Sequence, residues 1–216
     1  MELEKLYRQR FDSTEQAAKN KLWSTLCKHY FSRYIDKQDT VLDLAAGFCE
    51  FINNISCRRK IAVDVNSDIH RYANPDVEIV NASSVDLSMI PRESVDVVFV
   101  SNFFEHISKQ EILTTLNEGY KTLRKGGRIL IMQPNIKYVG GAYWDFFDHH
   151  TPLTEKSIKE ALELCGFHVN RLIPKFLPYT TKSKIPQFSW LIALYLHFPP
   201  AWKIMGKQSL VIAEKR

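Results

Sequence analysis

Short apolar runs alternate with longer stretches of helical periodicity along most of the chain. The runs of strand length lie at residues 40–44, 60–65, 77–80, 95–101, 128–132, 167–174 and 209–213. Apolar side chains at helical spacing predict helices over residues 15–35, 107–123 and 155–164. Strands that alternate with helices indicate parallel pairing, with helices on both faces of the sheet. We therefore expect an α/β fold built on a doubly wound, mostly parallel sheet.

The same pattern suggests how the chain is organised. Its 216 residues are enough for a single domain with a sizeable core. We divide that domain into an N-terminal helical segment (1–37), a core (38–135), a long aromatic loop (136–153) and a helical insertion between the last two strands (174–207).

The cysteines and the N-terminus limit the compartment. None of the four cysteines belongs to a CxxC pair or has a histidine at zinc-ligand spacing, so we expect reduced, mostly buried thiols. They are Cys27, Cys49, Cys57 and Cys165. The charged N-terminus lacks the apolar stretch of a secretion signal, and the expected location is the cytoplasm.

Two carboxylates lie at the ends of predicted strands. Asp43 belongs to the first run, which continues into the small residues of an Ala-Ala-Gly turn, and Asp64 follows 21 residues later at the end of the second run. Ligands of open α/β sheets bind at the carboxyl ends of the strands, where an acid can accept hydrogen bonds from ribose hydroxyls. The dinucleotide fingerprint GxGxxG is not matched, because only Gly47 of its three glycines is present.

This arrangement resembles the class I S-adenosylmethionine-dependent methyltransferases. Their first motif is close to Asp-Leu-Gly-x-Gly-x-Gly, which residues 43–49 match at Asp43, Leu44 and Gly47. Residues 95–107 and 123–130 are similar to the family's fourth strand with its loop and to the turn before its fifth strand. The resemblance covers about residues 38–135 and implies a Rossmann-like fold. It also implies S-adenosylmethionine as methyl donor and S-adenosylhomocysteine as product.

The resemblance also implies a set of cofactor-binding residues. Asp64 would bind the ribose, Ser83 falls where the family often has an acid beside the adenine, and Asp43 would serve the ammonium group. The full set is Asp43, Ala45, Ala46, Gly47, Asp64, Val65, Ser83, Ser84, Val85 and Asn102. Ala45 and Cys49 replace two motif glycines, and an alanine is tolerated wherever φ is negative. We expect an active enzyme; the alternative is a non-catalytic binding or regulatory protein with an eroded pocket.

The aromatic loop contains the candidate catalytic residues Asp148, His149 and His150. An imidazole beside a carboxylate can take the proton of an attacking hydroxyl, which favours O-methylation of a small acceptor such as a sugar, a lipid-linked molecule or a natural product. The other interpretation is that the histidines only fix the loop by hydrogen bonds. His106, which follows Glu105, is interpreted as a structural residue, and no metal site is expected. Oxygen and nitrogen both remain open as the methylated atom.

The net charge of +5 comes from the C-terminal part of the chain. Residues 171–216 contain eight basic residues and one acidic residue, whereas residues 1–170 contain 21 basic and 23 acidic residues. The insertion combines lysines with an apolar run of 11 residues at 188–198, too short to span a bilayer. We favour a helix packed on the core; the alternatives are a patch that contacts a membrane or lipid-linked acceptor, and attraction of an acidic acceptor. Nucleic acid is disfavoured because no reader motif is present.

Overall fold

The computed structural model describes residues 13–179 and 188–216. Those parts of the predicted segments 1–37 and 174–207 that fall on residues 1–12 and 180–187, including Lys182 and Lys184, lie outside the described residues.

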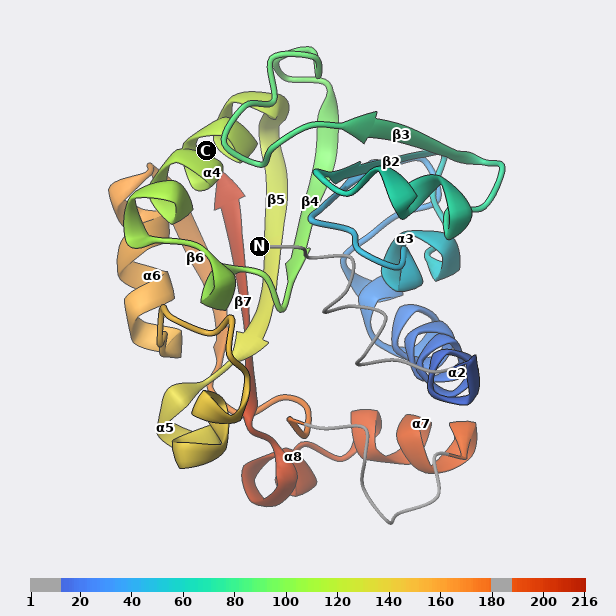
Figure 1. The fold of residues 1–216 in the computed structure, drawn as a ribbon, viewed down its shortest axis with the longest axis vertical. Coiled ribbons are helices and arrows are strands. Elements are labelled where there is room, and N and C mark those ends of the chain that lie inside the picture. Colours follow the sequence, from blue (N-terminus) through green and yellow to red (C-terminus); the bar gives the residue numbers. More distant parts are fainter. Residues whose placement is uncertain (1–12, 180–187) are drawn as a thin grey trace.

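Seven strands form one mixed sheet in the order β3-β2-β1-β4-β5-β7-β6 (Figure 1). The strands are β1 (Thr40–Leu44), β2 (Arg59–Asp64), β3 (Val77–Asn81), β4 (Val95–Ser101), β5 (Leu123–Pro134), β6 (Phe167–Ile173) and β7 (Gln208–Lys215). The pairs among β1 to β5 are parallel, and β7 is antiparallel to both β5 and β6. The expected mostly parallel, Rossmann-like sheet is therefore confirmed. The strand order reverses at β1 and β4, where such sheets bind ligands.

Helices cover both faces of this sheet. The α-helices are α2 (Ser13–His29), α3 (Glu50–Asn54), α4 (Lys109–Thr122), α5 (Ile136–Val139), α6 (Glu155–Leu164), α7 (Ser189–His197) and α8 (Pro199–Met205). The 3₁₀ helices are η1 (Phe31–Arg33), η2 (Ser67–Arg71), η3 (Phe104–His106) and η4 (Gly140–Asp145). In Figure 1, α4 and α6 lie on one face and α2 and α3 on the other. The predicted helix over 15–35 ends earlier, at His29.

Alternation along the strands creates two separate cores. Leu42 and Val98 belong to the core beneath α4 and α6, whereas Val41 and Val97 belong to the core beneath α2 and α3. Aromatic rings fill the second core: Phe51 of α3 stacks on Phe99 of β4 with ring centroids 3.6 Å apart. This double coverage buries the strands and leaves their carboxyl ends as the edge where polar groups gather.

The insertion between β6 and β7 folds as α7 and α8. Leu196 and Trp202 belong to the core that also contains residues of α2, and the Trp202 indole N–H donates to the carbonyl of Tyr195 at 2.7 Å. In Figure 1, α7 and α8 lie beyond the carboxyl ends of β4 and β5. The insertion therefore lies at the same edge of the sheet as the strand-end residues.

Candidate functional site

The loop after β1 has an unusual backbone. Ala45, Gly47 and Cys49 all have positive φ, at 55°, 53° and 58°. An alanine is expected to replace glycine without strain only at a negative φ, and Ala45 does not meet this condition. A left-handed residue other than glycine costs about 1–2 kcal/mol, so the loop adopts a glycine-type conformation although two of the three positions hold alanine and cysteine.

Asp64 connects this loop to the end of β2. Its Oδ2 accepts the Gly47 N–H at 2.8 Å, and its Oδ1 accepts the Asn66 N–H at 2.8 Å. A carboxylate oxygen can accept more than one hydrogen bond. Both oxygens therefore retain acceptor capacity beyond the loop contacts, as a ribose with two hydroxyls requires. A Cβ built on Gly47 would meet no atom within 4 Å, so the loop leaves space on that side.

Asp43 lies in the middle of an acidic group. Its side chain is buried in β1, and burial raises its pKa well above the ordinary value, with the carboxylates of Glu50 and Asp64 adding to the effect. Burial also raises the pKa of Glu50, although the charge of Lys19 opposes this shift. A bound cation would relieve this repulsion. The group therefore fits the ammonium group and the sulfonium of S-adenosylmethionine.

The remaining predicted cofactor residues differ in their surroundings. Val65 is 57% exposed beside Asp64, and Asn102 is exposed, with a φ of 47° at the end of β4. Ser83 is exposed and Val85 partly buried in the turn after β3. Ser84 is different, because its buried hydroxyl lies 2.8 Å from the hydroxyl of Thr115 on α4. The Ser84 side chain thus connects the turn to a helix, and only its backbone is suited to a ligand.

The Ala46 and Cys49 backbone amides hold the loop in place. Ala46 N–H donates to the Val63 carbonyl at 3.1 Å, and Cys49 N–H donates to the Ala46 carbonyl at 2.8 Å. Burial raises the pKa of the Cys49 thiol to about 12, which makes it a packing group and not a nucleophile. All four cysteines are free thiols, and three of them are buried.

A second polar group forms where η3 meets the aromatic loop. His106 Nδ1 lies 3.1 Å from Asp148 Oδ2 and 3.3 Å from the Asp148 carbonyl oxygen. Because both partners are acceptors, Nδ1 carries the proton and Nε2 has the lone pair. Nε2 lies 4.0 Å from Glu105 Oε1. The structure therefore forms an imidazole–carboxylate pair, but Asp148 pairs with His106 of η3 and not with the adjacent His149 or His150.

Glu105 is the most deeply buried acid of this group. It is 3% exposed, and its Oε2 has no hydrogen-bond partner among the described residues. Burial raises its pKa to about 8, although a hydrogen bond from its own backbone opposes this shift. At neutral pH the side chain therefore holds a proton.

His149 and His150 occupy positions that fix the loop. His149 is buried, its Nδ1 lies 3.0 Å from the Tyr143 carbonyl, and its ring stacks on Phe146. His150 Nε2 lies 2.7 Å from the His106 carbonyl, and its Nδ1 lies 3.1 Å from the Thr151 hydroxyl. That hydroxyl donates to the Ile107 carbonyl, so it can only accept from His150. Both ring nitrogens of His150 therefore lie within hydrogen-bond distance of protein groups, which fixes the ring against η3 and the loop.

Glu105, His106 and His149 offer ligand atoms that all lie within 4.8 Å of one another. The sequence predicts no metal site because the adjacent histidines of the loop have no further ligands at suitable spacing, whereas this group brings together residues that are far apart in the sequence. The short His106–Asp148 contact directs one of its imidazoles toward a carboxylate outside the group. A carboxylate on Nδ1 is also the usual partner of a metal-ligating histidine, so this contact is compatible both with proton transfer at Nε2 and with metal binding there.

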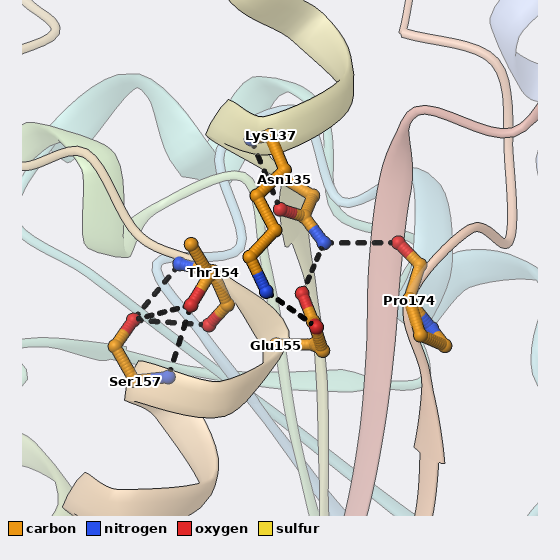
Figure 2. Close-up of polar contacts among 6 residues, drawn as sticks. All are labelled: Asn135, Lys137, Thr154, Glu155, Ser157 and Pro174. Atoms are coloured by element: carbon orange, nitrogen blue, oxygen red, sulfur yellow. Dashed lines mark hydrogen bonds and ion pairs between the residues drawn. The ribbon is translucent and has the colours of Figure 1, made fainter.

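The aromatic loop is anchored at both ends by a buried network (Figure 2). Asn135, at the end of β5, donates to Glu155 Oε2 at 2.7 Å and to the Pro174 carbonyl at 3.0 Å. Lys137 Nζ lies 2.8 Å from Glu155 Oε1. Thr154, the expected N-cap of α6, forms a capping box with Ser157. These contacts fix both ends of the segment that carries Asp148.

Comparisons with known proteins agree with this geometry. Residues 42–131 match the model of a methyltransferase domain family. No curated protein matches the chain. Among solved structures, an S-adenosylmethionine-dependent methyltransferase from Archaeoglobus fulgidus superposes with a TM-score of 0.65 at 22% identity, over 89% of this chain and 94% of the other. A possible histamine N-methyltransferase from Thermotoga maritima has a TM-score of 0.68 at 12% identity, over 94% of each chain.

A structure of the Haloferax volcanii Trm112 methyltransferase activator in complex with a putative methyltransferase matches with a TM-score of 0.67 at 18% identity, over 94% of each chain. At these identities the structural matches show the fold. With the domain match, they support an S-adenosylmethionine-dependent methyltransferase of class I with S-adenosylmethionine as its cofactor. Among residues 13–179 and 188–216, no helix is long and apolar enough to cross a membrane.

Proposed function

We propose that the protein methylates a hydroxyl group of a small molecule, with His106 as the general base and Asp148 as the carboxylate that orients it. The observation that carries this proposal is the 3.1 Å contact between His106 Nδ1 and Asp148 Oδ2. A neutral amine has its own lone pair, whereas an alcohol becomes a strong nucleophile only as it loses its proton. An imidazole oriented by a carboxylate therefore favours oxygen as the target atom.

The cofactor side of the site uses the carboxylates at the strand ends. Asp64 would accept the ribose hydroxyls while holding the loop through Gly47 N–H, and Asp43 would face the cationic groups. S-adenosylmethionine supplies a methyl group that its sulfonium already activates. The protein's own contribution is to bind this donor, align the acceptor oxygen and accept its proton.

The proton moves from the acceptor hydroxyl to His106 Nε2. Asp148 keeps the Nδ1 proton in place and stabilises the imidazolium that forms. The side chain of His106 is 23% exposed, so a substrate can reach it from outside. The backbone of the loop is tied to this base, because His150 N–H and Thr151 N–H both donate to the Glu105 carbonyl, at 3.0 and 3.2 Å.

The acceptor would lie against the aromatic loop. Trp144 and Phe147 of this loop are 56% and 86% exposed. Flat aromatic faces suit the apolar face of a sugar ring or of another ring system. The acceptor class proposed is therefore a hydroxylated ring compound, such as a sugar or an aromatic natural product.

The test combines calorimetry with an acceptor screen. We expect S-adenosylmethionine and S-adenosylhomocysteine to bind the wild-type protein, and sugars or phenols to stimulate S-adenosylhomocysteine release. His106→Asn should lower kcat by about 10²–10⁴-fold while cofactor affinity is retained. His168→Asn, at an exposed histidine of β6, is the matched control and should retain full activity. Absence of cofactor binding at millimolar ligand, or full kcat in His106→Asn, would contradict the proposal.

A further inference from the structure

The α7–α8 pair turns one side toward the core and the other toward solvent. Several large apolar side chains of this pair are exposed, and we call them together the α7–α8 face. They are Phe188, Trp190, Leu194, Phe198 and Ile204, which are 50%, 65%, 60%, 56% and 83% exposed. Trp190 and Leu194 are four residues apart in α7 and therefore share one side of that helix. Large exposed apolar side chains that share a surface mark an interaction site.

Contacts with the core fix the orientation of this face. Leu196 and Trp202 are 1% and 6% exposed on the inner side of the helices. The Tyr195 hydroxyl donates to the Phe176 carbonyl at 2.6 Å, just after β6. The apolar outer surface is therefore a stable feature of the fold.

Charge distinguishes this region from the rest of the chain. Residues 164–213 contain no acidic residue, although 24 of the 216 residues of the chain are acidic, or one in nine. The same 50 residues contain six lysines and arginines. Among the described ones, Lys203 and Lys207 are exposed at the end of α8 and just after it. Aromatic and aliphatic side chains flanked by lysines, without acids, complement an anionic surface.

The face lies next to the site. Asn135, at the start of the aromatic loop, donates its backbone N–H to the Lys207 carbonyl at 3.0 Å. In Figure 1, α5, α8 and α7 follow one another along the edge of the molecule at the carboxyl ends of the strands. A surface that contacts this face therefore also lies near the loop that carries Asp148.

We propose that the α7–α8 face docks on an anionic lipid bilayer, with the two helices lying in the interface and the site close to the headgroups. Trp190 and Phe198 suit the depth at which aromatic side chains lie in bilayers, and the lysines face the headgroup charges. A second copy of the chain fits less well, because a symmetric contact of this face would bring the lysines of both copies together with no acid from residues 164–213 to pair with them. Docking on the bilayer does not depend on the proposed reaction. The further idea that docking brings a membrane-bound acceptor to the site does rest on the proposed function.

Vesicle sedimentation tests this docking. The wild-type protein should bind vesicles that contain about 30% phosphatidylglycerol and be released by about 1 M salt, which shortens the screening length to about 3 Å. Binding to pure phosphatidylcholine vesicles should be much weaker. The double variant Trp190→Glu/Leu194→Glu should lose binding. Its matched control is Met89→Glu/Leu164→Glu, at residues that are 73% and 75% exposed before β4 and at the end of α6, outside the α7–α8 face.

A charge variant separates the electrostatic part. Each basic charge near an anionic surface contributes about fivefold to binding. Lys203→Glu changes the charge by two units, so it should weaken vesicle binding about thirtyfold. Lys125→Glu, at an exposed lysine near the start of β5, should have little effect. All variants should bind S-adenosylmethionine like wild type. This result would show that the variants are folded and that a loss of vesicle binding does not come from damage to the cofactor site.

Three results would overturn the inference. The wild-type protein would fail to bind anionic vesicles at low salt; or the Trp190→Glu/Leu194→Glu variant would bind as well as its control; or analytical ultracentrifugation would show a dimer that this variant abolishes. The last result would assign the face to self-association.

Discussion

The buried carboxyl group of Glu105 predicts an unusual pH dependence of stability. Burial raises its pKa from an ordinary value of 4.5 to about 8. Between these two pH values the unfolded chain is ionised at this position while the folded chain holds a proton. Folding then requires proton uptake, so the free energy of unfolding falls as the pH rises from about 4.5 to about 8.

The size of this effect follows from the two pKa values. One pKa unit corresponds to about 1.4 kcal/mol. Glu105 therefore lowers the free energy of unfolding by about 3 kcal/mol at pH 7 and by about 5 kcal/mol well above pH 8. Glu105→Gln keeps the shape of the side chain and cannot ionise. The variant should therefore be more stable than wild type by about these amounts, and nearly equal to it near the ordinary carboxyl pKa.

Urea unfolding of both proteins from about pH 5 to pH 9, followed by circular dichroism, measures the difference. Glu155→Gln is the matched control, at an acid that is 4% exposed. Burial raises the pKa of Glu155, but hydrogen bonds from Lys137 and Asn135 outweigh this, and the pKa is lowered. The ionised Glu155 carboxylate therefore stabilises the fold above the ordinary carboxyl pKa, and this stabilisation is lost in acid. Glu155→Gln should then destabilise the protein at neutral pH. A constant gap between wild type and Glu105→Gln at all pH values would refute the reasoning.

Three further predictions concern the site. Asp64→Ala should weaken S-adenosylmethionine binding in calorimetry by about 10- to 100-fold, because a hydrogen bond to a charged group contributes about 1.5–3 kcal/mol; unchanged affinity would remove Asp64 from the ribose site. Wild-type affinity should rise with pH through the raised pKa of Asp43, because the cationic ligand prefers the ionised acid. Asp43→Asn should abolish this rise, and an equal slope in both proteins would contradict the assignment. Turnover should be unchanged by excess EDTA, whereas loss of activity that zinc restores would make Glu105, His106 and His149 a metal site.

The fold could be predicted because its signals are local. Each strand is a short apolar run, and β1 and β4 begin and end where the pattern places them. The predicted run 128–132 extends to Leu123–Pro134 in β5, because backbone pairing with β4 continues from Leu123 across an irregularity near Val95 and Val97. Neither apolar pattern nor turn residues report such a pairing.

The proposed catalytic pair was beyond the reach of local reasoning. His106 and Asp148 are separated by 42 residues, and only the return of the aromatic loop onto η3 brings them together. The sequence showed an imidazole beside a carboxylate within Asp148-His149-His150. Neighbouring residues in a loop often point apart, however, and Asp148 contacts the histidine of another loop. The sequence signal for this site is the Glu105-His106 pair after a buried strand, which by itself favours a structural role.

The loop after β1 shows why replaced motif residues are a poor guide to a lost pocket. Ala45 and Cys49 stand in place of glycines, yet both have left-handed φ values. The conformation is imposed from outside these residues, by Asp64 on Gly47 N–H and by the Val63 carbonyl on Ala46 N–H. Two such residues cost about 2–4 kcal/mol together, a strain that persists only where the surrounding structure determines the backbone. Asp64, which we propose as the ribose acceptor, also holds this loop, so under the proposal the contacts that maintain the strained backbone would also maintain the cofactor site. The conformation, and not the glycine content, therefore favours a functional pocket over an eroded one.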